Sequence, residues 1–196
     1  KLPEFGFLTT SEIEKAERTP EGRKALCQAE FDAAKKAYDS GDYKSAVEEY
    51  KKFLEETLVK LGSDCPSGLS DIAKKGLEEA SFRAIASLTR SEDRIAAYNK
   101  FITAYPGSAF LKDAYFTLGA LQATSFNYEE AKKNYEEARK RGYNLIDIDK
   151  ALATLPKTEE EAKLVRIHLN SFRESWEFAE GYLGKNNYLA SVNLEN

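Results

Sequence analysis

Two segments of this 196-residue chain match each other, and this internal repeat constrains the fold more than any other feature of the sequence. Residues 33–53 read AAKKAYDSGDYKSAVEEYKKF, and residues 118–138 read LGALQATSFNYEEAKKNYEEA. The aligned pairs are Tyr43 with Tyr128, Ala46 with Ala131, Tyr50 with Tyr135, and Phe53 with Ala138. Self-similarity of this kind indicates an architecture in which one supersecondary unit is copied along the chain.

A degenerate second copy lies between these two segments, at residues 81–101, so the segment 118–138 belongs to the third copy. Tyr98 and Phe101 occupy its last two aligned places, and Arg94 stands where the other copies have alanine. Each of the two clear copies has small residues on one stripe, then a short turn, then a helix that opens with tyrosine. Small side chains let two helices approach to the short end of the usual 8–10 Å, so each copy predicts a helical hairpin.

Capping residues set the helix bounds that we expect. Thr19-Pro20-Glu21 supplies an N-cap, a proline at the first helical position and an acid in the first turn. Ser91 and Ser108 are predicted N-caps, and Thr158 with Glu161 forms a capping box. No alternating strand pattern of useful length occurs. The predicted helices are 20–39, 43–60, 70–88, 91–104, 108–124, 128–141 and 158–184, with shorter ones near 10–17 and 146–153.

The pattern resembles the tetratricopeptide repeat (TPR), a helix–turn–helix unit of about 34 residues. The third copy carries the resemblance best, at Tyr115, Leu118, Gly119, Tyr128, Ala131, Tyr135 and Ala138. The junction 97–119 is similar to a bacterial subtype found in periplasmic envelope proteins, such as the Tol-Pal coupling protein and the lipoprotein subunit of the β-barrel assembly machinery. The resemblance implies an all-α solenoid of about three hairpins.

We expect an N-terminal leader at 1–19, three TPR-like hairpins at 20–143 (20–60, 70–104 and 108–141), and C-terminal capping or extension helices at 144–196. Apolar residues recur along the last predicted helix every three or four positions, as in an amphipathic helix. A solenoid needs an end that covers its last apolar face, so this helix is predicted to be a cap. The alternative is self-association through Phe172 and Trp176.

Two cysteines, Cys27 and Cys65, are the only ones in the chain. Cys27 precedes the turn residue Gly41 by 14 residues, and the antiparallel partner helix regains that level near Thr57. The loop around Cys65 could then fold back onto Cys27. The spacing allows a disulfide and equally allows two buried thiols. A disulfide would imply an oxidising compartment, in line with the periplasmic resemblance.

Composition argues against several classes of function. The net charge of −4 gives no basis for binding a polyanion such as nucleic acid, and no apolar run approaches the roughly 18 residues of a membrane span. One histidine, His168, and two cysteines leave little material for a metal site or a nucleophile–base pair. We therefore expect no enzyme activity, no metal and no cofactor.

The first helices of TPR hairpins line an inner groove, so the resemblance implies binding residues there: Gln28, Phe31, Lys35, Tyr38, Glu79, Arg83, Asp113 and Phe116. These residues do not match the clamp with which some TPR domains grip a C-terminal carboxylate, because Phe31, Glu79 and Phe116 stand where a clamp lysine would be. Two phenylalanines with Lys35 and Arg83 suit a peptide with apolar anchors and some acidic character. The alternative is that Phe31 and Phe116 pack inside the solenoid.

The leading hypothesis is a non-catalytic scaffold of the bacterial cell envelope, periplasmic or associated with the outer membrane, that binds a peptide or protein segment in its groove. A lipid anchor could then precede Lys1. The alternative is a structural protein that self-associates into a homo-oligomer through its C-terminal helix, or that binds a small ligand together with a partner protein.

Overall fold

The computed structural model describes residues 10–168 and 170–171, and these residues form helices and loops without any β-strand. The all-α prediction is therefore confirmed for this part of the chain. The chain divides into two compact units, Lys1–Ala114 and Tyr115–Asn196, and each is described by itself. The predicted self-association residues Phe172 and Trp176 lie outside the described residues.

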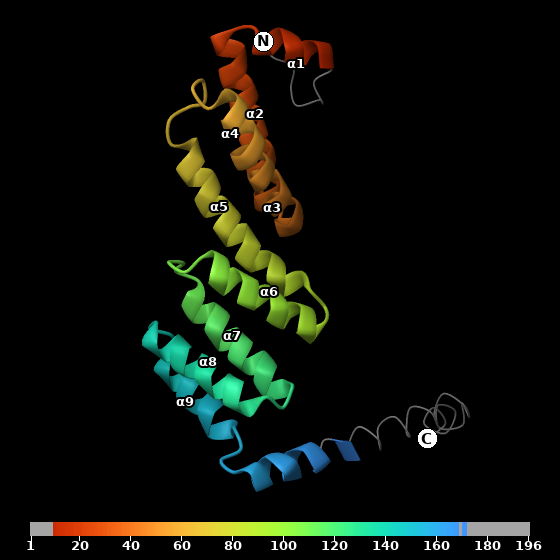
Figure 1. The fold of residues 1–196 in the computed structure, drawn as a ribbon, viewed down its shortest axis with the longest axis vertical. Helices are drawn as coiled ribbons and strands as arrows, with labels where there is room; N and C mark the ends of the chain where they lie inside the picture. The colour runs from red at the N-terminus through yellow and green to blue at the C-terminus, as the bar shows by residue number, and fades with distance from the viewer. Residues whose placement is uncertain (1–9, 169, 172–196) are drawn as a thin grey trace, which may run out of the picture. The chain divides into compact units, whose positions relative to one another are not determined.

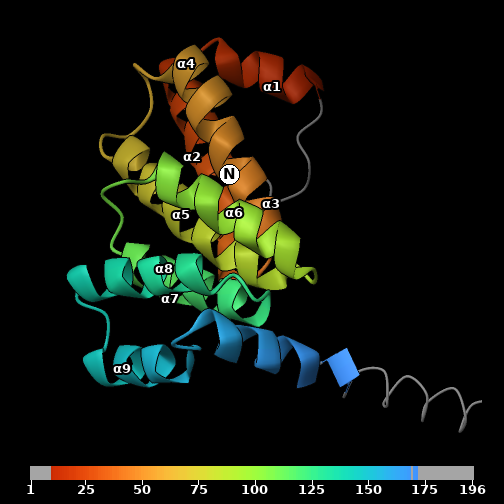
Figure 2. The ribbon, with the colours of Figure 1, turned by 60° about the horizontal axis from the view of Figure 1, so that its bottom comes forward.

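In the first unit, α2 packs against α3, α3 against α5, and α5 against α6 (Figures 1 and 2). The bounds of α1, α2 and α6 agree with the predicted 10–17, 20–39 and 91–104. The predicted helix 43–60 is one helical run that a π-helical turn interrupts. The elements are α1 (Thr10–Glu17), α2 (Pro20–Asp39), α3 (Tyr43–Lys52), η1 (Phe53–Thr57), α4 (Leu58–Leu61), α5 (Leu69–Ala84), η2 (Ile85–Ser87) and α6 (Ser91–Ala104).

Side-chain caps begin the first two long helices. The Thr19 hydroxyl accepts a hydrogen bond of 3.0 Å from the backbone N–H of Gly22, as the sequence predicts. Asp42 caps α3 by accepting from the backbone N–H of Ser45 at 3.1 Å. Ser91 was predicted as the N-cap of α6, but it is the first helical residue, and the cap position is held by Arg90 without a side-chain hydrogen bond.

Small residues bring the helices of the first hairpin together. Ala34 on α2 and Ala46 on α3 are completely buried, and Tyr50 beside them is 4% exposed. A Cβ added to Gly76 on α5 would lie 2.5 Å from Cζ of Tyr50, a distance that atoms do not adopt without a shift. The Tyr50 ring therefore fills the space between α3 and α5, and glycine is needed opposite it.

In the second unit, α8 (Tyr128–Lys140) packs against α9 (Leu145–Thr154) and follows α7 (Leu111–Thr124). Its tyrosine, Tyr135, packs on the helix before it (α7), whereas Tyr50 packs on a helix after it (α5). Ala131 and Ala138 are completely buried, and Tyr135 is 4% exposed. A Cβ on Gly119 would lie 2.8 Å from Cδ1 of Tyr135. The predicted start of α7 at 108 was wrong by three residues, because the Ser108 hydroxyl accepts from the backbone N–H of Phe110 and caps a turn before the helix.

Residues 159–168 and 170–171 are helical. The Thr158 hydroxyl accepts from the Glu161 N–H at 3.1 Å, and the Glu161 carboxylate accepts from the N–H of Lys157 at 2.6 Å, so one half of the predicted capping box is present and the other half is shifted by one residue. Ala162 and Val165 lie on the apolar stripe of the helix that was predicted to be a cap. Ala162 is half-buried, but Val165 is 39% exposed.

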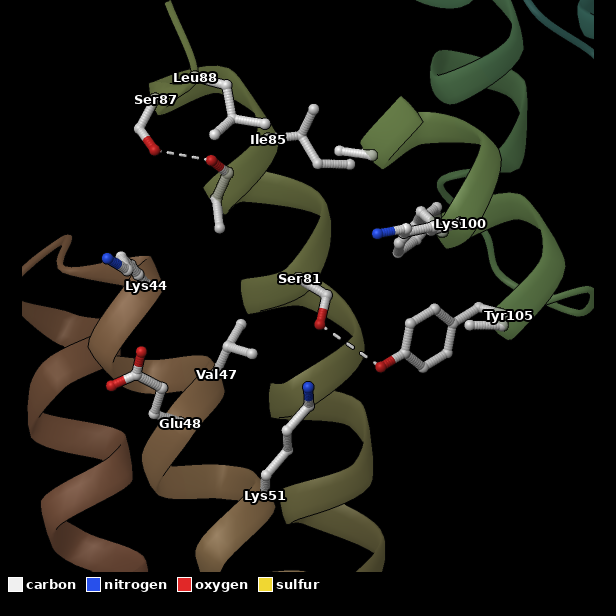
Figure 3. Close-up of a pocket in the computed structure, with 14 residues that line it drawn as sticks. Lys44, Val47, Glu48, Lys51, Ser81, Ile85, Ser87, Leu88, Lys100 and Tyr105 are labelled. Carbon is white, nitrogen blue, oxygen red and sulfur yellow. Dashed lines mark hydrogen bonds between the residues drawn. The ribbon is translucent and has the colours of Figure 1, made fainter. Parts of the chain in front are cut away.

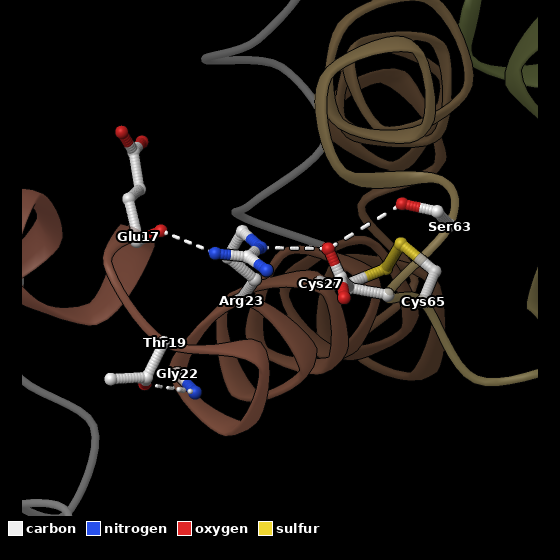
Figure 4. A network of polar contacts seen from close by, with 8 residues as sticks. Glu17, Thr19, Gly22, Arg23, Cys27, Ser63 and Cys65 are labelled. Atoms are coloured by element: carbon white, nitrogen blue, oxygen red, sulfur yellow. Dashed lines mark hydrogen bonds and ion pairs between the residues drawn. A yellow bond between two sulfur atoms is a disulfide. The ribbon is translucent and has the colours of Figure 1, made fainter.

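Cys27 and Cys65 form a disulfide, with their Cα atoms 5.5 Å apart. It joins α2 to the loop that follows α4, and Cys27 is completely buried. Beside the disulfide, Nε of Arg23 donates to the Asp64 carboxylate at 2.7 Å, and Nη1 donates to the carbonyl oxygen of Glu17 at 2.9 Å (Figure 4). The covalent and polar links together hold α1, α2 and the loop at one end of the hairpin.

Reduction of this disulfide should destabilise the first unit. The bond closes a loop with a sequence separation of 38 residues, which corresponds to about 4 kcal/mol of lost chain entropy in the unfolded state. We expect urea unfolding of the Cys27→Ala/Cys65→Ala variant to show a loss of this order. Addition of a reductant should lower the stability of the wild type and leave the variant unchanged. Two free thiols in the unreduced wild type would contradict the bond.

Candidate functional site

Three of the residues predicted to line a groove come together in the first unit. The Tyr38 hydroxyl on α2 is hydrogen-bonded to the carboxylate of Glu79 on α5. Arg83 lies one turn further along α5 and donates to the same carboxylate, from Nε at 2.9 Å and from Nη2 at 2.7 Å. We call these three side chains, together with Tyr43, the α2–α5 cluster.

Tyr43 was missed as a candidate for the site. The guanidinium of Arg83 lies 5.5 Å from the centre of its ring, which is within the range of a cation–π contact. The Tyr38 and Tyr43 rings meet edge to face at 5.5 Å. In the sequence, Tyr43 stands out only as the residue aligned with Tyr128 in the repeat. The signal that could have found it is the pair of tyrosines on either side of the turn at Gly41.

The hydrogen bonds of the α2–α5 cluster fix its protonation states. Burial and the bond to Glu79 raise the pKa of Tyr38 to about 12, so at neutral pH the phenol is protonated and donates. The Tyr38 hydroxyl is also the main reason that the pKa of Glu79 lies below its ordinary value, and Arg83 lowers it further. The cluster therefore holds a carboxylate anion, a guanidinium cation and a neutral phenol.

Gln28 and Lys35 lie on α2, as Tyr38 does, but each is bonded to another residue of α2 and not to the cluster. Nε2 of Gln28 donates to Asp32 at 2.9 Å, and the ammonium of Lys35 pairs with the carboxylate of Asp39, which raises the pKa of Lys35. The side chain of Lys35 remains 56% exposed. Lys35 is therefore an exposed cation on α2 that is paired with one carboxylate, Asp39.

Phe31 is not a groove residue. It is 5% exposed and packs edge to face against Tyr50 at 6.3 Å and Phe53 at 5.6 Å. The prediction that Phe31 contacts a peptide is therefore wrong, because it lies three residues before Ala34 on the stripe that packs against α3. It belongs to the hydrophobic core of the first hairpin.

The two predicted residues on α7 do not extend the α2–α5 cluster either. Asp113 is half-buried in the first turn of α7. Phe116 belongs to the second unit, where its ring stacks on Tyr143 at a centroid distance of 4.1 Å and an interplanar angle of 10°. It also lies 5.5 Å from the Tyr135 ring. Like Phe31, Phe116 packs against other aromatic rings, as the alternative interpretation of the sequence expected.

Within residues 10–168 and 170–171, no group of three or more His, Cys, Asp or Glu side chains is placed to hold a metal ion. None of the described helices has the length and apolarity required to cross a membrane. Comparison with protein families gives no matching family model, and comparison with curated proteins gives no match.

The α2–α5 cluster should make stability depend on pH through Glu79. Because its pKa is lower in the folded protein than the ordinary value of 4.5, the unfolded chain binds the proton first as the pH falls. The stability that Glu79 contributes is present above about pH 4.5 and is lost below it. The difference in unfolding free energy between wild type and Glu79→Gln should therefore shrink between pH 6 and pH 3. The unfolding free energies of both proteins should be measured over this pH range.

The matched variant for this measurement is Tyr38→Phe, which keeps the ring and removes the hydroxyl. It should raise the pKa of Glu79, measured by carbon NMR of the side-chain carboxyl, and weaken the pH dependence. An unchanged Glu79 titration in Tyr38→Phe would show that the hydrogen bond between α2 and α5 is absent in solution.

Proposed function

We propose that this chain is a non-catalytic protein-interaction scaffold built from TPR-type hairpins. The equivalent tyrosines of the three copies, Tyr50, Tyr98 and Tyr135, are each 4% exposed, so this position is buried in all three hairpins. The hairpins are α2 with α3, α5 with α6, and α7 with α8. Helical hairpins of this kind serve as binding scaffolds for many partners.

The binding surface in this proposal is the exposed side of α2 and α5, centred on Arg83. The observation that carries it is the orientation of this arginine: Glu79 and the Tyr43 ring hold the guanidinium in place, while its side chain is still 46% exposed. A guanidinium has five N–H donors, and Glu79 engages two of the nitrogens. The remaining donors suit a carboxylate on an acidic peptide, and the tyrosine rings offer apolar surface beside it.

The disulfide supports the location in this proposal. Disulfides persist in oxidising environments such as the bacterial periplasm, and the Cys27–Cys65 bond closes a loop in the first hairpin. We therefore place the scaffold in the cell envelope, in the periplasm or at the outer membrane, with any lipid anchor on residues that precede Lys1.

The proposal is tested by selecting peptides from a randomised phage library on the immobilised protein and measuring the affinity of the enriched sequence by fluorescence anisotropy. We expect acidic peptides, bound at least tenfold more weakly by Arg83→Ala. The matched control is Arg90→Ala, which removes another exposed arginine that pairs with a glutamate, at 2.6 Å. Equal effects of the two variants would contradict the proposed surface.

Self-association is a second candidate, because apolar side chains stand exposed on the C-terminal helix. Leu164 is 57% exposed and Ile167 is 62% exposed. Monomeric proteins rarely expose contiguous apolar patches without a binding role. On this proposal the helix would bury these side chains against a second copy.

Sedimentation equilibrium tests this second candidate. The wild type should sediment as an oligomer, and Leu164→Glu/Ile167→Glu should sediment as a folded monomer. Val59→Glu serves as the control, since Val59 is 81% exposed on α4 and lies in the first unit. A monomeric wild type, or dissociation by the control as well, would rule out this role for the helix.

A further inference from the structure

A hollow lies in the first unit away from the α2–α5 cluster, and none of its lining residues comes from α2. Its volume is about 580 Å³, it is open to solvent, and α3, the end of α5 with η2, and α6 line it (Figure 3). This volume falls within the roughly 300–1,000 Å³ of small-molecule sites. Because its residues belong to one compact unit, the hollow is a property of that unit alone.

The floor of the hollow is apolar. Ile85 and Phe101 are 5% and 3% exposed and belong to the core beneath it, and Val47 and Leu88 add aliphatic surface from either side. The hydroxyl groups in the lining already have partners. The hydroxyls of Ser81 and Tyr105 lie 3.4 Å apart (Figure 3), and Ser87 donates to the carbonyl oxygen of Ala84 at 2.7 Å.

The rim is positively charged, although the chain as a whole carries a net charge of −4. Lys44 and Lys51 approach from α3 and Lys100 from α6, against a single acid, Glu48. Lys51 and Lys100 extend toward the hollow (Figure 3), and neither takes part in an ion pair with any residue that the structure describes. Lysine stems can lie along apolar surface while their ammonium groups stay in water.

We propose that this hollow binds a small amphipathic carboxylate, with its alkyl chain on the floor and its anionic head among the rim lysines. The lysines of the rim favour an anionic ligand, and the apolar floor favours an alkyl chain on that ligand. A peptide would bring backbone N–H and C=O groups onto a floor whose hydroxyls are already paired, and burying unpaired polar groups is costly. An alkyl chain has no polar groups that would be left unpaired there. This inference does not depend on the proposed peptide-binding surface.

The experiment is a titration of the ¹⁵N-labelled full chain with decanoate, followed by amide chemical shifts. Decanoate should shift the amides of Ser81, Ile85 and Phe101 and leave those of Leu145 and Ile146, which are exposed apolar residues of the second unit, unchanged. 1-Decanol, which has the same chain without the charge, should bind at least tenfold more weakly. Shifts at Leu145 and Ile146 instead, or equal binding of decanol, would overturn the proposal.

Variants separate the head-group contact from the chain contact. Lys51→Gln/Lys100→Gln should weaken decanoate at least fivefold and leave decanol unchanged, whereas Lys36→Gln, at an exposed lysine of α2 outside the hollow, should change neither. Ala104→Trp adds a bulky ring at the rim and should weaken both. Circular dichroism checks that each variant is folded. If Lys36→Gln weakens decanoate as much as the rim variant does, or if acidic peptides shift the hollow's amides at lower concentration than decanoate, the site is not a small-carboxylate site.

Discussion

The packing of one tyrosine against small residues is the constraint on which the hairpins depend. Tyr50 and Tyr135 can be buried only because their neighbours have little or no side chain: Gly76 faces Tyr50, and Gly119 faces Tyr135. The helices approach closely at these points, and the ring fills the space that remains. The second hairpin departs from this rule. Phe82 occupies the place that Ala34 has in the first copy, and its ring contacts Tyr98 at 6.1 Å and Phe101 at 5.4 Å.

The hollow lies beside this second hairpin. Where alanine permits close approach, a phenylalanine keeps its neighbours apart, and Arg94 stands where the other copies have Ala46 and Ala131. The Arg94 Nε atom is buried and has no hydrogen-bond partner among the described residues. The hollow is lined by Phe101 and Ala97 on the same helix.

Sequence patterns predicted where the helices begin and end better than which side of each helix is buried. The bounds of α2 and α6 were predicted correctly, and in α2 local chemistry (Thr19 with Pro20) is what stops the chain from extending the helix. Phe31 was assigned to the wrong side of α2. Its spacing suits both the groove side and the crossing side of α2, because an apolar stripe more than 100° wide includes both. Only the position of α3 decides between them. The sequence left the disulfide undecided for a different reason: it depends on the path of the loop around Cys65, which has no periodic pattern.

The helix α5 separates the two proposed sites. Glu79 and Arg83 are one turn apart and face α2, while Ser81 and Ile85 are one turn apart and face the hollow. Two residues of an α-helix subtend about 200°, so the two pairs lie on opposite sides of the same rod. Ala80, completely buried between them, leaves no room for the helix to rotate without loss of packing. The two surfaces also share α3, which carries Tyr43 of the cluster and Lys44 and Val47 of the hollow. A ligand on one side can therefore influence the other by moving α3 or α5.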